Sequence, residues 1–155
     1  ETMLRDLTLM KQNNINMVRT SHYPNNPGFY AMMDHFGIWA CDEGDLEDHA
    51  NQTISDNPTW IPAFVDRITR LVTRDRNHAC VAMWSLGNEA GDGDNFMRMK
   101  EAAIALDKTR KFHYEGDFDF TKSDVISRMY PTADVMTKMG NRQPVEISAF
   151  DNLAK

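Results

Sequence analysis

Short apolar runs alternate with amphipathic helical patterns along the chain, and this alternation constrains the fold more than any other feature. Apolar residues at helical spacing, punctuated by proline and glycine, predict helices over 2–13, 27–36, 58–76 and 95–106. Runs rich in β-branched and aromatic residues predict strands over 15–20, 38–43, 81–86, 112–115 and 124–129. Strands separated by helices form right-handed βαβ units, so we expect an α/β fold with about five parallel strands.

Two parallel architectures fit this order: an open doubly wound sheet, or part of an eight-stranded α/β barrel. A Rossmann-type cofactor site requires a GxGxxG loop after a strand, and the sequence has none. Unusual polar residues instead follow each predicted strand, at the edge where barrels hold their active sites. They are Arg19, His22, Asp42, Glu43, Glu47, His49, Asn88, Glu89, Glu115, Asp117 and Tyr130. The sequence therefore predicts a partial (β/α)8 TIM barrel.

Composition excludes several classes of partner. The 155 residues carry a net charge of −6 with no cluster of Lys and Arg, which argues against nucleic acid and anionic membranes. No apolar stretch approaches the roughly 20 residues of a membrane span. Cys41 and Cys80 lie in apolar runs and are expected to be buried reduced thiols, which suits a cytoplasmic location. The chain begins at Glu1 within a helical pattern, so we expect it to be a fragment.

Asn88 and Glu89 are the strongest candidates for catalysis. They lie where an apolar strand opens into the Gly-rich loop of WSLGNEAGDG. A carboxylate there is half buried by the strand and half open to a ligand, as a general acid requires. A strand-end pair that only makes turn hydrogen bonds fits the spacing equally well.

Glu47 and His49 are two residues apart in an extended loop, so both side chains can point the same way. Together they can bind a cation, either Mg²⁺ or a transition metal, although a solvated loop is the simpler interpretation. Taken singly, His22 in SHYP fits an exposed loop histidine, and Tyr130 in RMYP fits a core tyrosine.

Five stretches together resemble glycoside hydrolase family 2, and most closely its β-galactosidases. They are MKQNNINMVRTSHYPN at 10–25, DEGDLEDH at 42–49, RDRNHACVAMWSLGNEAGDG at 74–93, HYEGD at 113–117 and SRMYP at 127–131. They follow the family's order, and the SHYP and GNE motifs are specific to it. The β-glucuronidases of the family differ in the LExH and GNEAGDG stretches, so the resemblance favours β-galactosides such as lactose as substrates.

The resemblance implies a role for each matching residue. Glu89 corresponds to the acid/base of a retaining glycosidase, and Asn88 to the residue that hydrogen-bonds the sugar 2-hydroxyl. His22 corresponds to a contact of the galactosyl hydroxyls. Tyr130 corresponds to the tyrosine beside the nucleophile, and Arg19 to the arginine that pairs with the nucleophile carboxylate.

A metal site is implied in the same way. Glu47, His49 and Glu89 correspond to the family's Mg²⁺ ligands, while ligands for a possible Na⁺ are expected outside this chain. Asp48 and Ala50 stand where the family has a Thr-like residue and Gly, a difference that can alter metal affinity slightly.

The family's nucleophile, which lies in a CEYAHAMGNS-like segment, has no counterpart here. Glu146 in RQPVEIS lacks the preceding Cys and the following aromatic residue, so we do not assign it that role. We expect residues 1–155 to supply the second to sixth strands of one catalytic barrel. The first, seventh and eighth strands and the flanking β-sandwich domains would then be absent. Such a chain is expected to be inactive alone, within a parent enzyme that is a homo-oligomer or has two subunits.

Three other interpretations remain open. The chain can be a non-catalytic complementing or scaffold fragment of such an enzyme. It can come from a family 2 relative that acts on another β-glycoside, such as a β-glucuronide. Less plausibly, it is a complete small metallohydrolase that uses Glu47 and His49.

Overall fold

The structure, a computed structural model, describes residues 1–145. Within that range four strands form a parallel sheet in chain order: β1 (Met17–Arg19), β2 (Trp39–Glu43), β3 (Val81–Asn88) and β4 (Lys111–Glu115). Neighbours in sequence are neighbours in the sheet, without the reversal of order that marks a doubly wound fold. This is the connectivity of a barrel wall.

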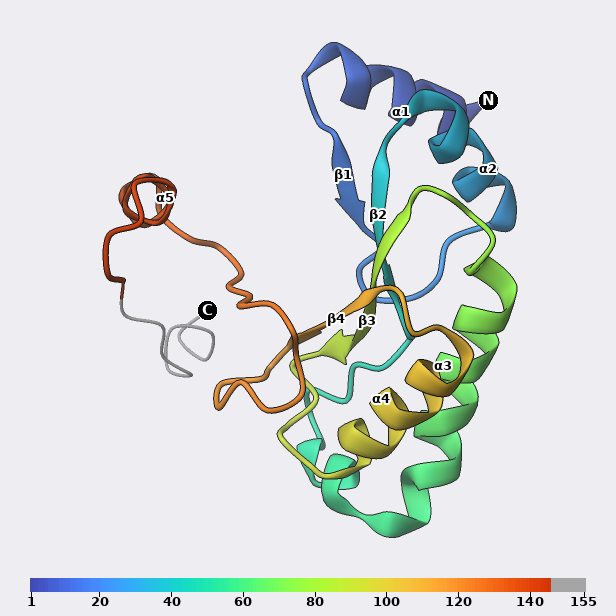
Figure 1. The fold of residues 1–155 in the computed structure, drawn as a ribbon, viewed down its shortest axis with the longest axis vertical. Helices are drawn as coiled ribbons and strands as arrows, with labels where there is room; N and C mark the ends of the chain where they lie inside the picture. The colour runs from blue at the N-terminus through green and yellow to red at the C-terminus, as the bar shows by residue number, and fades with distance from the viewer. Residues whose placement is uncertain (146–155) are drawn as a thin grey trace.

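Helices lie before and between the strands. They are α1 (Thr2–Gln12), α2 (Pro27–Phe36), the 3₁₀ turns η1 (Gln52–Asp56) and η2 (Pro58–Trp60), α3 (Ile61–Asp75), α4 (Asn95–Leu106) and α5 (Ala133–Gly140). Figure 1 shows α1 to α4 along one side of the sheet, while the chain after β4 leaves on the other side and leads to α5. The predicted helices and the first four predicted strands are thus confirmed within a few residues.

The ends of α2 show how local sequence sets these boundaries. The Asn26 side chain caps the helix by accepting a hydrogen bond from the backbone N–H of Gly28, and Pro27 occupies the first turn. Gly37 ends the helix in the left-handed conformation, at φ +64°, which glycine adopts without steric cost. The chain can therefore turn sharply into β2.

The two faces of the sheet differ in chemistry because side chains alternate along each strand. The face toward the helices carries Ala40, Trp84, Leu86, Phe112 and Tyr114, all buried in the hydrophobic core. That core continues into α3 and α4 through rings of Phe64, Phe96 and Tyr114 whose successive centroids lie 5.2 and 4.1 Å apart. The helices thus hold the sheet by apolar contact on this face.

The opposite face of the sheet carries polar side chains in adjacent positions. Parallel pairing places Glu43 of β2 beside Ser85 of β3, and Ser85 beside His113 of β4. All three are buried, with at most 6% of their surface exposed. In a barrel this face is the interior, so the strand register brings a row of polar groups beneath the active-site edge.

The fifth predicted strand, 124–129, does not form. Its first residue approaches β4, where the backbone N–H of Asp124 donates to the carbonyl oxygen of Phe112 over 2.7 Å. However, the N–H of Phe112 donates to the Asp124 side chain over 2.8 Å, so a carboxylate takes the place of a backbone acceptor. Ser123 also bonds both backbone groups of Val125. These local bonds compete with a ladder, and pairing stops after one step.

Two further predictions can be compared with the described residues. Cys41 and Cys80 are free and buried, as expected, and burial raises the pKa of each thiol to about 12, so both stay protonated. Across residues 1–145, none of the helices combines the length and the apolar character needed to cross a bilayer.

Candidate active site

Polar side chains from all four strands meet at the C-terminal edge of the sheet, with Glu43 at their centre. Arg19 donates from Nε to Glu43 Oε2 over 2.6 Å and from Nη2 to Oε1 over 3.0 Å. Nδ1 of His22 lies 2.8 Å from Oε1, and the Ser85 hydroxyl donates to Oε2 over 2.5 Å. One buried carboxylate therefore joins β1, the loop after β1, β2 and β3.

Asn88 connects this group to the acidic edge of the site. Its Oδ1 accepts a hydrogen bond of 2.8 Å from Nη2 of Arg19. Its amide nitrogen then faces Glu47 Oε1 at 2.9 Å and Glu89 Oε2 at 3.3 Å. Three of the predicted site residues, Arg19, Asn88 and Glu89, are thus linked in a chain, with Glu47 bound to its middle member.

Glu89 is held at the end of β3 by backbone contacts. It has a positive φ of +44°, which is uncommon outside glycine, and its N–H donates to the carbonyl oxygen of Glu115 over 2.6 Å. Gly87, two residues before, approaches the carbonyl oxygen of Leu46 so closely that a Cβ atom would lie 2.5 Å from it. The tight passage of β3 past these neighbours aims the Glu89 side chain, 16% exposed, into the site.

The predicted metal ligands come together as expected. Glu47, His49 and Glu89 each offer a ligand atom, and these atoms lie within 4.8 Å of one another. Nδ1 of His49 is 3.6 Å from Glu89 Oε2. Two carboxylates and one imidazole with open approach fit a divalent cation that keeps several waters, as Mg²⁺ does, and the imidazole also suits Zn²⁺.

A second acidic cluster, Asp92, Asp117 and Asp119, has a structural explanation. The Lys122 ammonium lies 2.5 Å from Asp92 and 3.6 Å from Asp119, and its side chain is 5% exposed. Asp117 accepts backbone N–H groups from residues 121–123. The cluster therefore neutralises a buried lysine and closes a loop after β4.

Ser85, His113 and Glu115 belong to the site but were not assigned a role from the sequence. Nδ1 of His113 lies 2.8 Å from the Ser85 hydroxyl, and Nε2 lies 2.8 Å from that of Ser127, which donates to Glu115. Strand alternation in WSL and FHYE places Ser85 and His113 on one face, and that signal was available. Their pairing with Glu43 depends on strand register, which the sequence does not give.

The two buried glutamates of the site, Glu43 and Glu115, are ionised. Burial alone would raise their pKa values, but hydrogen bonds and charge from Arg19 lower the pKa of Glu43, helped by Ser85 and His22. Hydrogen bonds from His113 and Ser127 likewise lower the pKa of Glu115. Two fixed negative charges therefore lie beneath the C-terminal edge of the sheet, each with its own hydrogen-bond donors.

The remaining predicted residues lie at different distances from this network. His22 belongs to it through Glu43, and its Nε2 is 3.8 Å from Glu47 Oε2. Tyr130 lies on the segment beyond β4, with φ +54° and 70% of its surface exposed. It is therefore not the core tyrosine that its sequence context also allowed. Glu146 lies outside the described residues.

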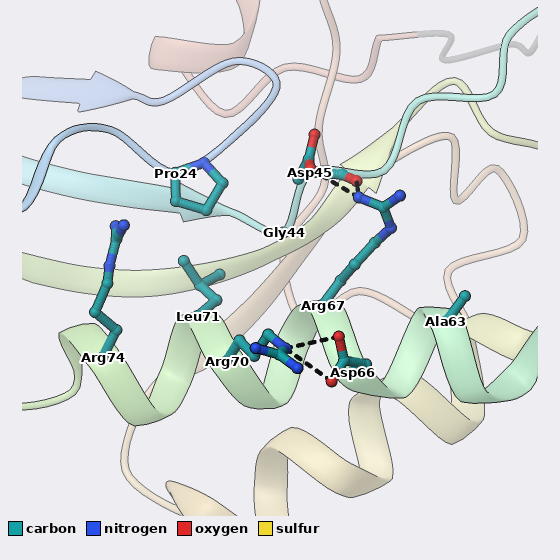
Figure 2. Close-up of a pocket in the computed structure, with 9 residues that line it drawn as sticks. All are labelled: Pro24, Gly44, Asp45, Ala63, Asp66, Arg67, Arg70, Leu71 and Arg74. Carbon is teal, nitrogen blue, oxygen red and sulfur yellow. Dashed lines mark hydrogen bonds and ion pairs between the residues drawn. The ribbon is translucent and has the colours of Figure 1, made fainter.

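A cavity of about 160 Å³ opens beside Glu89 and includes His49, Gln52 and Phe118 in its wall. A larger one, about 430 Å³, lies elsewhere, between α3 and the loops that follow β1 and β2. Figure 2 shows Arg67 paired with Asp45 and Arg70 with Asp66 in its wall. Because these cations are already neutralised and no predicted site residue lines it, the smaller cavity is the better candidate for substrate.

Comparison with known proteins places this geometry in a family. Residues 1–149 match the family described as "Glycosyl hydrolases family 2, TIM barrel domain". A "Beta-galactosidase" of Pectobacterium atrosepticum is 45% identical over 138 residues, which cover 86% of this chain and 13% of that protein. The chain thus spans about an eighth of the relative's length.

Solved structures agree on the fold. A β-D-glucuronidase of Dictyoglomus thermophilum superposes with a TM-score of 0.63 at 24% identity, over 80% of this chain and 24% of that chain. The Bifidobacterium dentium β-glucuronidase complexed with coumarin-3-O-glucuronide gives 0.62 at 27% identity, over 73% and 20%. With the family match covering nearly the whole sequence, this chain belongs to glycosyl hydrolase family 2 and forms part of its TIM barrel domain.

Proposed function

We propose that this chain supplies the acid/base half of the active site of a retaining β-galactosidase, with Glu89 as the acid/base. The observation that carries the proposal is the position of Glu89: at the C-terminal end of β3, bonded to Asn88 and lining a cavity. The 45% identity to a β-galactosidase supports the substrate class.

In the proposed reaction, the protonated Glu89 carboxyl gives its proton to the glycosidic oxygen as the bond to the anomeric carbon breaks. The resulting carboxylate then takes a proton from the water that hydrolyses the glycosyl-enzyme. A retaining enzyme needs a nucleophilic carboxylate about 5–5.5 Å from the acid/base. Glu43 and Glu115 do not suit that role, because both are 1% exposed or less and both carboxylates are held by hydrogen bonds. We therefore place the nucleophile outside the described residues.

The charge of the site favours a neutral sugar over a glucuronide. Glu43, Glu47 and Glu89 lie close together, and the guanidinium of Arg19 is already bound to Glu43 and Asn88. A glucuronide carboxylate would require a free cation here. The β-glucuronidase structures, although similar in fold, therefore support only the second candidate function.

We further propose that Glu47, His49 and Glu89 hold Mg²⁺ in the complete enzyme. The cation would supply positive charge beside the acid/base and orient water there. Glu47→Gln should then weaken Mg²⁺ activation, with a higher concentration needed for half-maximal rate. Exposed Glu101→Gln, which loses a salt bridge to Arg98 on α4, is the matched control. An unchanged Mg²⁺ requirement in Glu47→Gln would contradict the assignment.

The test of the catalytic proposal is Glu89→Gln in the full-length enzyme, with Glu101→Gln as control. Lactose turnover should fall by about 10²–10⁴-fold, the contribution typical of a general acid–base group. Nitrophenyl galactosides, whose leaving group needs little protonation, should be cleaved more readily in the first step. Azide should restore rate and yield β-galactosyl azide, because a retaining reaction displaces twice. Equal losses on every substrate without azide rescue would refute the role.

A further inference from the structure

Glu43 is the most highly connected side chain of the site, yet it has no part in the proposed acid/base or metal chemistry. It has no exposed surface, so it cannot touch substrate. We propose that Glu43 is a positioning residue, which fixes the proton of His22 on Nδ1 and, through Arg19, fixes the amide orientation of Asn88. The effect of Glu43 on catalysis rests on the proposed function.

The contact with Glu43 determines the tautomer of His22. An ionised carboxylate only accepts hydrogen bonds, so the 2.8 Å contact between Nδ1 and Glu43 Oε1 requires a proton on Nδ1. A neutral His22 then has its lone pair on Nε2. That nitrogen lies on the side of the ring toward Glu47, and it can accept a hydrogen bond from a sugar hydroxyl.

Glu43 also orients the side chain of Asn88, through Arg19. Glu43 binds Nε and Nη2 of Arg19 in a bidentate pair, which fixes the plane of the guanidinium. The same Nη2 donates to Asn88 Oδ1, and this leaves the amide nitrogen directed at Glu47 and Glu89. Without Glu43, both the arginine and the asparagine would lose their fixed orientation.

Only a carboxylate can accept all the hydrogen bonds that are made to residue 43. Four donors converge on it: two from Arg19, Nδ1 of His22 and the hydroxyl of Ser85. The two oxygens of a carboxylate offer about four acceptor positions, and all are used. Glutamine has the same shape, but its NH₂ group would face two donors. Glu43→Gln should therefore disturb these contacts without creating a cavity.

The tautomer can be measured directly, without catalysis. In the ¹⁵N-histidine-labelled chain at pH 8, two-bond ¹⁵N–¹H correlations should show His22 with a proton on Nδ1 alone. His78, whose Nδ1 lies 2.7 Å from Asp34, is the internal reference. Asp34→Asn should alter the His78 pattern and leave that of His22 intact, and Glu43→Gln should do the reverse. A wild-type His22 with a proton on Nε2 would overturn the proposal.

Kinetics of the full-length enzyme give an independent test. Glu43→Gln should raise KM for a nitrophenyl galactoside by about 10–100-fold, as expected for losing a hydrogen bond to a charged group. His22→Ala should also raise KM, and the double variant should be little worse than either single one. Additive effects, or an unchanged KM in Glu43→Gln, would overturn the proposal that Glu43 acts through His22. If the wild type cleaves no galactoside while His22 keeps its Nδ1 proton, only the proposed function fails.

Discussion

Asp42 and Glu43 are consecutive carboxylic acids on β2, and neither has exposed surface. Yet Asp42 is neutral and Glu43 is ionised. Glu43 faces the barrel interior, where Arg19 and other donors keep its pKa below the usual value. Asp42 faces the helices, where burial raises its pKa to about 8. The hydrogen bond from Tyr30 lowers this pKa, and the nearby Asp75 carboxylate raises it further. One-residue alternation along a strand thus separates a charged acid from a neutral one.

The contacts of Asp42 explain the difference. Its Oδ1 accepts hydrogen bonds from the hydroxyls of Tyr30 at 2.6 Å and Thr20 at 3.3 Å. Its Oδ2 has no hydrogen-bond partner within residues 1–145, so only one oxygen of the carboxyl has donors that could stabilise a negative charge. Arg74, whose charge lowers the pKa of Asp42, makes its hydrogen bonds to Asp75 instead. Equal burial therefore does not give equal ionisation, because the available cation decides it.

The two acids should differ most in how replacement by the neutral amide changes the free energy of unfolding. Glu43→Gln should lower the free energy of unfolding by about 3 kcal/mol, because it leaves the Arg19 charge without its bidentate partner. Asp42→Asn should change it by less than about 1 kcal/mol at pH 4, near the unfolded pKa of an aspartate, since Asp42 is neutral in the folded state there and Asn keeps the acceptor oxygen. Urea unfolding of the two variants measures both values. Equal losses would mean that the two faces hold acids in the same state.

The sequence predicted the fold well because helical and strand periodicities are local properties. The helix ended by Gly37 and the strand before Glu89 are examples. The predicted strand at 124–129 failed because its apolar pattern does not reveal that the Asp124 side chain takes up the N–H of Phe112. The helix α5 (Ala133–Gly140) was not among the helices predicted from the sequence.

The site was predicted less evenly. Glu47, His49, Asn88 and Glu89 were found from motifs, and the structure brings them together. Arg19 binds Glu43 within the described residues, a contact that the sequence did not predict, and its pairing with the nucleophile stays a prediction. The partnership of Glu43 with Ser85 and His113 depends on register between strands about 30–40 residues apart in the chain, and a single sequence does not specify register.

A second effect should appear in the pH dependence of stability. A carboxyl whose pKa is raised on folding stabilises the protein fully below its unfolded pKa, near 3.9, and this contribution is lost as pH rises toward about 8. The wild type should therefore lose at most about 1.4 kcal/mol per pH unit between pH 5 and 8 from Asp42. Asp42→Asn should remove that slope, as followed by thermal unfolding.

Asp66→Asn is the matched control for this measurement, because Asp66 is exposed and pairs with Arg70 on the surface of α3. It should leave the pH slope as in the wild type. If Asp42→Asn keeps the full slope, then Asp42 is ionised in the folded state and the contrast with Glu43 is wrong.

The smallest effect is expected at Thr20, whose hydroxyl touches both acids. It donates to Asp42 Oδ1 and accepts the backbone N–H of Glu43 over 2.9 Å. Thr20→Val keeps the shape but leaves that buried N–H without its acceptor, which should cost about 1 kcal/mol. Thr20→Ser keeps the hydroxyl and should retain both bonds, losing only the contacts of a methyl group. Because Tyr30 still holds Asp42 in Thr20→Val, the pH slope should persist while the whole stability curve moves down. A slope that vanished with the hydroxyl would show that Thr20, rather than burial, keeps Asp42 neutral.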